Sequence, residues 1–348
     1  MEQANLDWGK LPFGYIKTDY NIRVRYKDDK WGEMEISEDD SISLPISATC
    51  LHYGQECFEG LKAFRGADGV VRIFRLEENA KRLNFSARGL CMQQVPYEIF
   101  TKMCHEVVKL NTRFIPPYGT GASLYLRPSL IGVSASVGVK PADEYIFGVF
   151  CTPVGPYFSG GFNPVRVQIV RDFDRAAPMG TGVYKVGGNY AASLQALVRA
   201  KAEGYSTSLF LDSKEKKYID EAGPANFFGI KKNEHNDNYQ YITPRSNSIL
   251  RSITNMSIRD LAADMGLVVV ERPILVEELN DFCEAGTCGT AAVITPIKEV
   301  VDRELRVSYK FGDGETAGPI CTELYKRLVG IQYGELEDKF FWNTVLDI

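Results

Sequence analysis

Residues 183–190 have the sequence VYKVGGNY, in which Lys185 stands between Tyr184 and Val186 and two glycines follow. Lysine is ordinarily a surface residue, so most lysines in a chain of this length are simply solvated. In apolar surroundings, however, the ammonium group loses its stabilising water, its pKa falls, and the neutral amine becomes a nucleophile for carbonyl groups. We therefore expect Lys185 to carry chemistry.

Three further segments of the second half suit the same chemistry. Residues 220–228 (DEAGPANFF) place Glu221 at the start of an apolar strand, where a buried carboxylate needs a cationic partner. Residues 248–254 (SILRSIT) open a predicted helix, and residues 288–291 (CGTA) form a tight turn; both offer N–H groups to an anion. Taken alone, a Ser or Thr at a helix start is more often an ordinary cap. Together with the lysine, these segments are what a pyridoxal-phosphate site requires.

The chain resembles the fold-type IV aminotransferases, and among them the branched-chain amino-acid aminotransferases. Five segments carry the resemblance, in the order and approximate spacing of that family, and the similarity spans nearly the whole chain. They are residues 53–64 (YGQECFEGLKAF), 124–128 (LYLRP), 184–190 (YKVGGNY), 221–227 (EAGPANF) and 289–296 (GTAAVITP).

The resemblance implies an α+β fold of two domains with the active site between them. We expect a small N-terminal domain over residues 1–160, a linker over 161–182 and a large cofactor-binding domain over 183–348. The pattern of apolar residues predicts helices at 77–90, 97–110, 190–203, 253–265 and 319–331. It predicts strands at 123–132, 145–155, 208–212, 226–230, 239–243, 267–271 and 291–297, with a polar hairpin loop at 231–238.

For the cofactor, pyridoxal 5'-phosphate, the resemblance implies a role for each matching residue. Lys185 would form the Schiff base and later move the α-proton. Glu221 would pair with the pyridine nitrogen, and Tyr190 would hydrogen-bond the phenolic oxygen. Arg82 would hold the phosphate, as the fork of a guanidinium favours. The phosphate site would be completed by the backbone amides of Ile253 and Thr254 and by the hydroxyl of Thr290.

For the substrate, the resemblance implies a pocket with two uses. An apolar wall that includes Phe58 would accept a Leu, Ile or Val side chain. Arg127, with the Tyr53 hydroxyl, would neutralise the distal carboxylate of glutamate in the same pocket, although an arginine here could equally make a structural ion pair. Lys62 and Arg175 would line the site. The full expected set is Tyr53, Phe58, Tyr125, Arg127, Tyr157, Thr290 and Ala291.

The implied activity is transfer of the amino group between L-Leu, L-Ile or L-Val and 2-oxoglutarate by a ping-pong mechanism, as in branched-chain amino-acid biosynthesis. Family members are homodimers, so we expect a homodimer. Two rival hypotheses remain. One is another enzyme of the same fold, a D-amino-acid aminotransferase or an aminodeoxychorismate lyase; the other is a non-catalytic pyridoxal-phosphate carrier. Activity with L-leucine and 2-oxoglutarate separates the first rival, and an absorbance change on adding L-valine separates the second.

Composition limits the other classes of function. The 348 residues are 45% hydrophobic and 24% charged, with a net charge of -5, which argues against a nucleic-acid or membrane partner. The eight cysteines have irregular spacing and the three histidines form no metal motif, so we expect no disulfide framework and no metal site. We expect a cytoplasmic enzyme whose partners are small amino acids and 2-oxo acids.

Two departures from the family are visible. Ala292 and Thr295 occupy the places of the redox C-x-x-C that mammalian members carry, so thiol regulation of that kind is not expected. Arg251 and Ser252 stand where some members have Pro-Gly, at the start of the helix expected to bind the phosphate.

Overall fold

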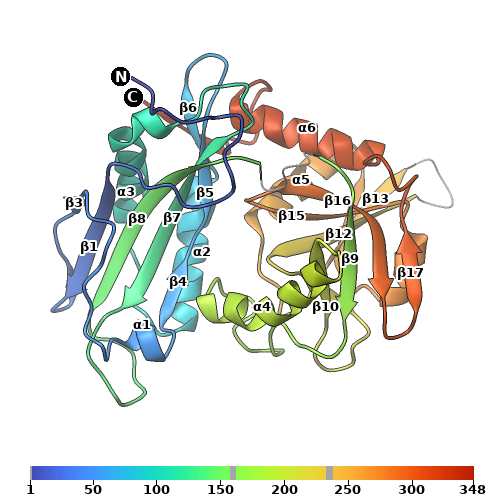
Figure 1. Cartoon of the computed structure of the whole chain (residues 1–348), viewed down its shortest axis with the longest axis horizontal. Helices are drawn as coiled ribbons and strands as arrows, with labels where there is room; N and C mark the ends of the chain where they lie inside the picture. The colour runs from blue at the N-terminus through green and yellow to red at the C-terminus, as the bar shows by residue number, and fades with distance from the viewer. Residues whose placement is uncertain (1, 157–161, 233–237) are drawn as a thin grey trace. The chain divides into compact units, whose positions relative to one another are not determined.

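The structure is a computed structural model that describes residues 2–156, 162–232 and 238–348. The chain divides into two compact units, which we describe separately (Figure 1). Unit 1 contains residues 1–157, 184–187 and 330–348, and unit 2 contains residues 158–183 and 188–329. Both the lysine segment and the C-terminal residues therefore group with the first half of the chain. The expected domain boundaries at 160 and 183 remain a prediction.

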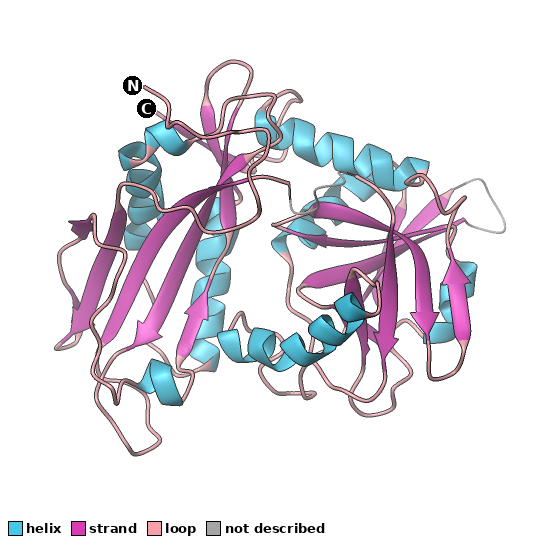
Figure 2. Cartoon of the chain, viewed as in Figure 1, coloured by secondary structure: helices cyan, strands magenta, loops and turns pink. Residues whose placement is uncertain are grey.

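Unit 1 is built on a nine-stranded antiparallel sheet (Figure 2). Its main order is β18-β6-β5-β7-β8-β1-β2, with β3 beside β1 and β4 beside β7. The strands are β1 (Asn21–Lys27), β2 (Lys30–Trp31), β3 (Glu35–Ser37), β4 (Glu56–Phe58), β5 (Leu61–Arg65), β6 (Val71–Phe74), β7 (Ser123–Gly132), β8 (Tyr145–Val154) and β18 (Asn343–Leu346). The helices are α1 (Thr49–His52), α2 (Leu76–Gly89), α3 (Tyr97–Leu110) and the 3-10 helix η1 (Thr112–Phe114).

The two faces of this sheet have different chemistry because side chains alternate along a strand. Leu124 and Leu126 of β7 join the buried cluster formed with α2 and α3, where Phe100 stacks on Phe147 at 5.8 Å. The intervening residues of β7, Tyr125 and Arg127, lie on the opposite face. The sheet therefore has one face that packs on helices and one that carries polar and aromatic side chains.

Unit 2 contains a closed ring of strands. Its sheet has the order β11-β10-β9-β16-β15-β12-β13-β14, β17 pairs with β16, and β11 also pairs with β12. The strands are β9 (Val165–Val170), β10 (Thr207–Leu211), β11 (Ile219–Ala222), β12 (Ala225–Lys232), β13 (Tyr239–Pro244), β14 (Val268–Arg272), β15 (Glu284–Gly289), β16 (Val293–Asp302) and β17 (Val307–Lys310). The helices are α4 (Gly187–Ala202), α5 (Ile253–Asp264), α6 (Pro319–Tyr333) and the 3-10 helix η2 (Val276–Asp281).

The range 161–182, expected to be a linker, contains strand β9. This strand pairs in parallel with both β10 and β16, and Val167, Ile169 and Val170 are buried. Its sequence, VRVQIV, follows a Pro and a Gly-rich stretch that suggested irregular structure. Pairing on both sides outweighs those local signals. The expected hairpin loop at 231–238 lies largely outside the described residues, since these omit 233–237.

Candidate active site

Lys185 lies in a segment that is anchored on both sides of it. Val186 is buried in the core of unit 1, and Tyr184 packs against that core with its ring 5.1 Å from Phe85. The backbone N–H of Lys185 donates to Ser86 Oγ at 2.9 Å, and its carbonyl accepts from Phe58 N at 3.1 Å. The segment is thus fixed while the lysine side chain is only half-buried.

The amine of Lys185 approaches an aromatic ring that also receives a guanidinium. Lys185 Nζ lies 4.8 Å from the centroid of the Phe58 ring, and Arg127 Cζ lies 4.7 Å from it. Arg127 also donates to the Tyr125 hydroxyl at 3.0 Å. Four residues expected at the site, Lys185, Phe58, Tyr125 and Arg127, therefore form one cluster in unit 1. Within the described residues, Arg127 Nε is buried and has no hydrogen-bond partner.

Lys62 extends this cluster along the same sheet face. It lies opposite Tyr125 in the pairing of β5 with β7, and its Nζ is 6.0 Å from the Phe13 ring. Only 7% of Lys62 is exposed, and this burial lowers its pKa to about 8. Burial acts in this direction because it penalises the charged ammonium. Lys62 was expected to line the site, and it lies on the face that carries Tyr125 and Arg127.

Arg82 makes a two-pronged ion pair with a residue that the sequence did not single out. Its Nε and Nη2 donate to the two carboxylate oxygens of Glu59, each at 2.7 Å. Glu59 has no exposed surface and Arg82 is 9% exposed. The pair fixes the guanidinium in the interior of unit 1. The expected phosphate contact of Arg82 stays a prediction.

Two expected substrate residues have other positions. Tyr53, at the end of α1, is 42% exposed; its hydroxyl donates to the carbonyl of Val137 and its ring packs on His52 at 4.1 Å. These contacts differ from those of the Phe58 cluster. Tyr157 lies outside the described residues.

Glu221 occupies a buried position on β11 in unit 2. It is 2% exposed, and its Oε1 lies 3.2 Å from Arg175 Nη2 and accepts from the backbone N–H of Leu250. Arg175 also donates to the carbonyls of Gly182 and Ser248. A buried carboxylate needs such donors. Arg175 was expected to line the site, and its ion pair partly offsets the charge of Glu221.

The neighbouring carboxylate, Asp220, holds the loop that leads to α5. It accepts from Ser246 at 2.9 Å and from Ser248 at 2.5 Å. Burial raises the pKa of Asp220, and these hydroxyl bonds act against that rise. Asp220 therefore fixes the approach to the helix that begins at Ile253.

The start of α5 offers donors to an anion. Ser252 is the N-cap, and its hydroxyl accepts from Asn255 N at 3.2 Å. Ile253 and Thr254 are the first two helical residues, and both are buried. Their N–H groups have no acceptor within the helix because the first turn lacks preceding carbonyls. A phosphate suits this position.

The other expected unit 2 residues lie near element ends. Thr290 and Ala291 form the turn between β15 and β16 and are half-buried. Val293, which ends that turn, has φ of 64°, a strained value for a β-branched residue. Tyr190 is in the first turn of α4 and its carbonyl accepts from Ser193 Oγ at 2.9 Å. Each unit thus supplies its own group of expected residues.

Comparison with known proteins agrees with this geometry. Residues 56–300 match the family described as amino-transferase class IV. A branched-chain-amino-acid aminotransferase of Haemophilus influenzae is 47% identical over 345 residues, covering 97% of this chain and 98% of the relative. One of Helicobacter pylori is 49% identical over 340 residues, covering 97% of each chain. The chain belongs to the branched-chain-amino-acid aminotransferases.

Solved structures of branched-chain aminotransferases confirm the α+β, fold-type IV assignment made from the sequence. The Escherichia coli enzyme aligns with a TM-score of 0.78 at 26% identity, covering 94% of this chain and 99% of that one. The enzyme of the archaeon Thermoproteus uzoniensis aligns with a TM-score of 0.74 at 24% identity, covering 93% and 99%, and supports the fold alone.

In this aminotransferase, the residues that sequence reasoning missed are those that hold the expected ones in place. Glu59 fixes Arg82, Ser86 binds the backbone of Lys185, and Asp220 fixes the loop before α5. One signal was available for Glu59. It stands between Phe58 and Gly60 in an otherwise apolar stretch, and an acid in a buried strand needs a cation. A serine on a helix face, such as Ser86, gives no comparable signal.

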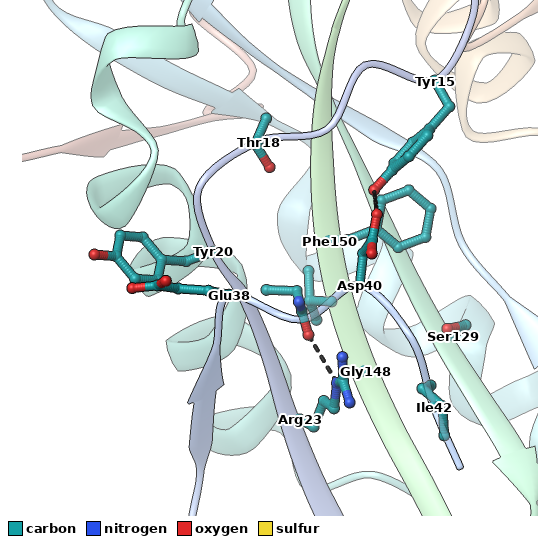
Figure 3. Close-up of a pocket in the computed structure, with 12 residues that line it drawn as sticks. Tyr15, Thr18, Tyr20, Arg23, Glu38, Asp40, Ile42, Ser129, Gly148 and Phe150 are labelled. Atoms are coloured by element: carbon teal, nitrogen blue, oxygen red, sulfur yellow. Dashed lines mark hydrogen bonds between the residues drawn. The ribbon is translucent and has the colours of Figure 1, made fainter. Parts of the chain in front are cut away.

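A cavity of about 300 Å³ lies in unit 1 on the face of the sheet that also carries Arg127 (Figure 3). Tyr15 donates to Asp40 at 3.0 Å at its edge, and Arg23 donates to Asn21 at 2.8 Å. Its lining contains no residue of the expected site. The aminotransferase reaction therefore gives it no role.

Two further observations concern the described part of the chain. No helix in it combines the length and the apolar character needed to cross a bilayer. The eight cysteines are all described and all unpaired; Cys57, Cys104, Cys151, Cys288 and Cys321 are buried.

Proposed function

We propose that this branched-chain aminotransferase moves the amino group between L-Leu, L-Ile or L-Val and 2-oxoglutarate, with pyridoxal 5'-phosphate held by Lys185. The observation that carries the proposal is the cluster around Phe58. There the Lys185 amine, on a fixed backbone, lies beside an aromatic ring and close to Arg127. This arrangement gives one nucleophilic amine next to one anion-binding group.

The cofactor proposal also has support from relatives. Solved branched-chain aminotransferases that are 25% identical to this chain are complexed with pyridoxamine 5'-phosphate, with N-(5'-phosphopyridoxyl)-L-glutamate and with 4-methylvaleric acid. These compounds combine the cofactor, glutamate and a branched aliphatic acid. When bound, pyridoxal phosphate supplies an aldehyde that captures the amino group and a ring that accepts electrons from Cα.

The donor set of this chain fits such a cofactor. The first N–H groups of α5, at Ile253 and Thr254, suit a phosphate, and Thr290 adds a hydroxyl. Buried Glu221 suits a protonated ring nitrogen, and Tyr190 suits the phenolic oxygen. In this proposal the guanidinium of Arg82 binds the phosphate, while Glu59 orients it.

Lys185 has two tasks in the proposed reaction. Its Nζ holds the cofactor before substrate arrives, and it then accepts the proton from Cα of the amino acid. The ping-pong order follows because the amino group stays on the enzyme until the 2-oxo acid leaves. Phe58 and Tyr125 form an apolar wall for the branched side chain, and Arg127 binds the distal carboxylate of glutamate.

The family resemblance supplies the rest of the proposal. We propose a homodimer in the cytoplasm. Tyr53, Tyr157 and Ala291 keep their proposed roles toward the substrate, and Lys62 lies on the face that would receive it.

Lys185→Ala tests the proposal. We expect the purified variant to lose the visible absorbance of bound pyridoxal phosphate and to lose turnover by about a hundredfold to ten-thousandfold, or more, because a general base is removed. Lys81→Ala, which removes an exposed lysine of α2, is the control and should keep both.

Borohydride reduction followed by peptide mapping identifies the attached amine. We expect the label on Lys185. A label on Lys62, whose burial gives it a pKa of about 8, would contradict the assignment. So would an active, yellow Lys185→Ala protein.

A further inference from the structure

Three hydrogen bonds hold the backbone of residues 185–187 in unit 1. Ser86 Oγ accepts from Lys185 N at 2.9 Å, and Phe58 N donates to Lys185 O at 3.1 Å. The third bond runs from Gly187 N to Oε1 of Glu56. Ser86 and Phe58 act at the lysine itself, whereas Glu56 acts two residues after it. The Glu56 contact is the only one of the three made by an ionisable side chain.

Glu56 is well suited to this contact. It is half-buried at the start of β4, where it pairs in register with Ile131 of β7. Burial raises the pKa of its carboxyl, while the Gly187 N–H and the charge of Arg127 act against that rise. Gly187 is the first residue of α4, so its N–H has no acceptor inside the helix. A carboxylate that accepts such an N–H makes a stronger bond than a neutral acceptor does.

The fit between the two residues is also steric. A Cβ added at Gly187 would meet Glu56 Oε1 at a distance that real Cβ atoms do not show, whereas one added at Gly188 would meet nothing within 4 Å. The first glycine is therefore required by the approach of Glu56. The two glycines after the lysine are not equivalent.

We propose that Glu56 is a positioning residue for Lys185, which fixes the backbone after the lysine and thereby the direction of its amine. The proposal rests on the function proposed for Lys185. It assigns to Glu56 no contact with substrate or cofactor. The expected consequence of losing it is a poorly aimed amine on an otherwise intact protein.

Glu56→Ala and Glu56→Gln test this role. In the Ala variant, kcat for leucine should fall about tenfold to a hundredfold, because a small misplacement of a reacting group is costly, while KM changes less than about threefold. The absorbance maximum or the pH midpoint of the bound cofactor should shift. Gln keeps an acceptor oxygen and should recover most of kcat. Glu98→Ala, an exposed glutamate of α3, is the control.

A double substitution tests whether the contact itself is responsible. Gly187→Ala alone should lower kcat because its Cβ collides with the carboxylate. Once Glu56 is Ala, the collision is gone, so the double variant should be no worse than Glu56→Ala. If Gly187→Ala lowers kcat by the same factor with and without Glu56, the inference is overturned.

The two proposals fail in different ways. Borohydride labelling of the wild type at a lysine other than Lys185 overturns the proposed function. Labelling at Lys185 together with an unchanged kcat and cofactor spectrum in Glu56→Ala overturns only the role of Glu56. A fall in kcat that Gln does not recover, with an equal loss in unfolding midpoint for both variants, assigns Glu56 a merely structural role and also overturns the inference.

Discussion

The ring of Phe58 receives two cationic groups, the amine of Lys185 and the guanidinium of Arg127. Cations are attracted to the face of an aromatic ring, so the ring holds both groups near one place without neutralising either. An incoming carboxylate could then bind Arg127, whose Nε has no hydrogen-bond partner among the described residues. A single aromatic side chain thus organises the reactive amine and the anion-binding group.

Replacement of Arg127 by Met should separate the two substrates. Met keeps an apolar stem beside Phe58 but loses the charged donor, and a hydrogen bond to a charged group is worth about 1.5–3 kcal/mol. We expect kcat/KM for glutamate to fall about tenfold to a hundredfold and that for leucine to fall less than about fivefold. Steady-state assays of the two half-reactions measure this. Arg113→Met, at an exposed ion pair with Asp19, is the control, and equal losses for both substrates would exclude the proposed role.

Single residues could be predicted from the sequence where a motif carried them. Lys185, Phe58, Tyr125 and Arg127 were named from three separate segments, and the structure brings them together. Their holding residues could not be predicted in this way. Glu56 acts on a backbone N–H 131 positions away, and no sequence pattern encodes such a contact.

Among the elements, the start of α5 carries a testable role. Ser252→Ala removes the N-cap bond to Asn255, which should cost about 1 kcal/mol of unfolding free energy. It should also weaken cofactor binding severalfold, since the N–H groups of Ile253 and Thr254 would be less well ordered. Urea unfolding and cofactor titration measure the two effects. Thr101→Ala on α3, whose hydroxyl bonds within the helix, should leave cofactor affinity unchanged.

Elements with strong periodicity were predicted well. The helix expected at 97–110 is α3 and the strand expected at 123–132 is β7, with both ends in agreement. Strand β15 was not expected, because its sequence EAGTCG has two glycines and no alternation. It forms because β12 and β16 pair with it on both sides. Such strands depend on their neighbours, which a local pattern does not contain.

For the whole molecule, burial of Lys62 gives stability a pH dependence. Its pKa is about 8 in the folded protein and 10.5 without burial, so between these values the unfolded chain binds more protons. The free energy of unfolding therefore rises with pH in that window, and is lower by about 3 kcal/mol below pH 8.

Lys62→Met should remove this dependence. We expect the variant to be more stable than the wild type at pH 7 by up to about 3 kcal/mol, and this advantage to shrink as pH rises from 8 to 10.5. Urea unfolding of both proteins across this range measures the difference, which cancels the titration of other groups. A constant difference across the range would contradict the lowered pKa. Lys81→Met, at an exposed position, should show no such change.

Strand β18 has a consequence for how the protein is made. It completes one edge of the unit 1 sheet by pairing Asn343 with Phe74 of β6. During translation, β6 leaves the ribosome long before β18 exists, so this edge must wait, unpaired, while unit 2 is synthesised. An exposed strand edge invites pairing with other chains. The nascent protein is therefore most vulnerable to aggregation in the interval before its last few residues emerge.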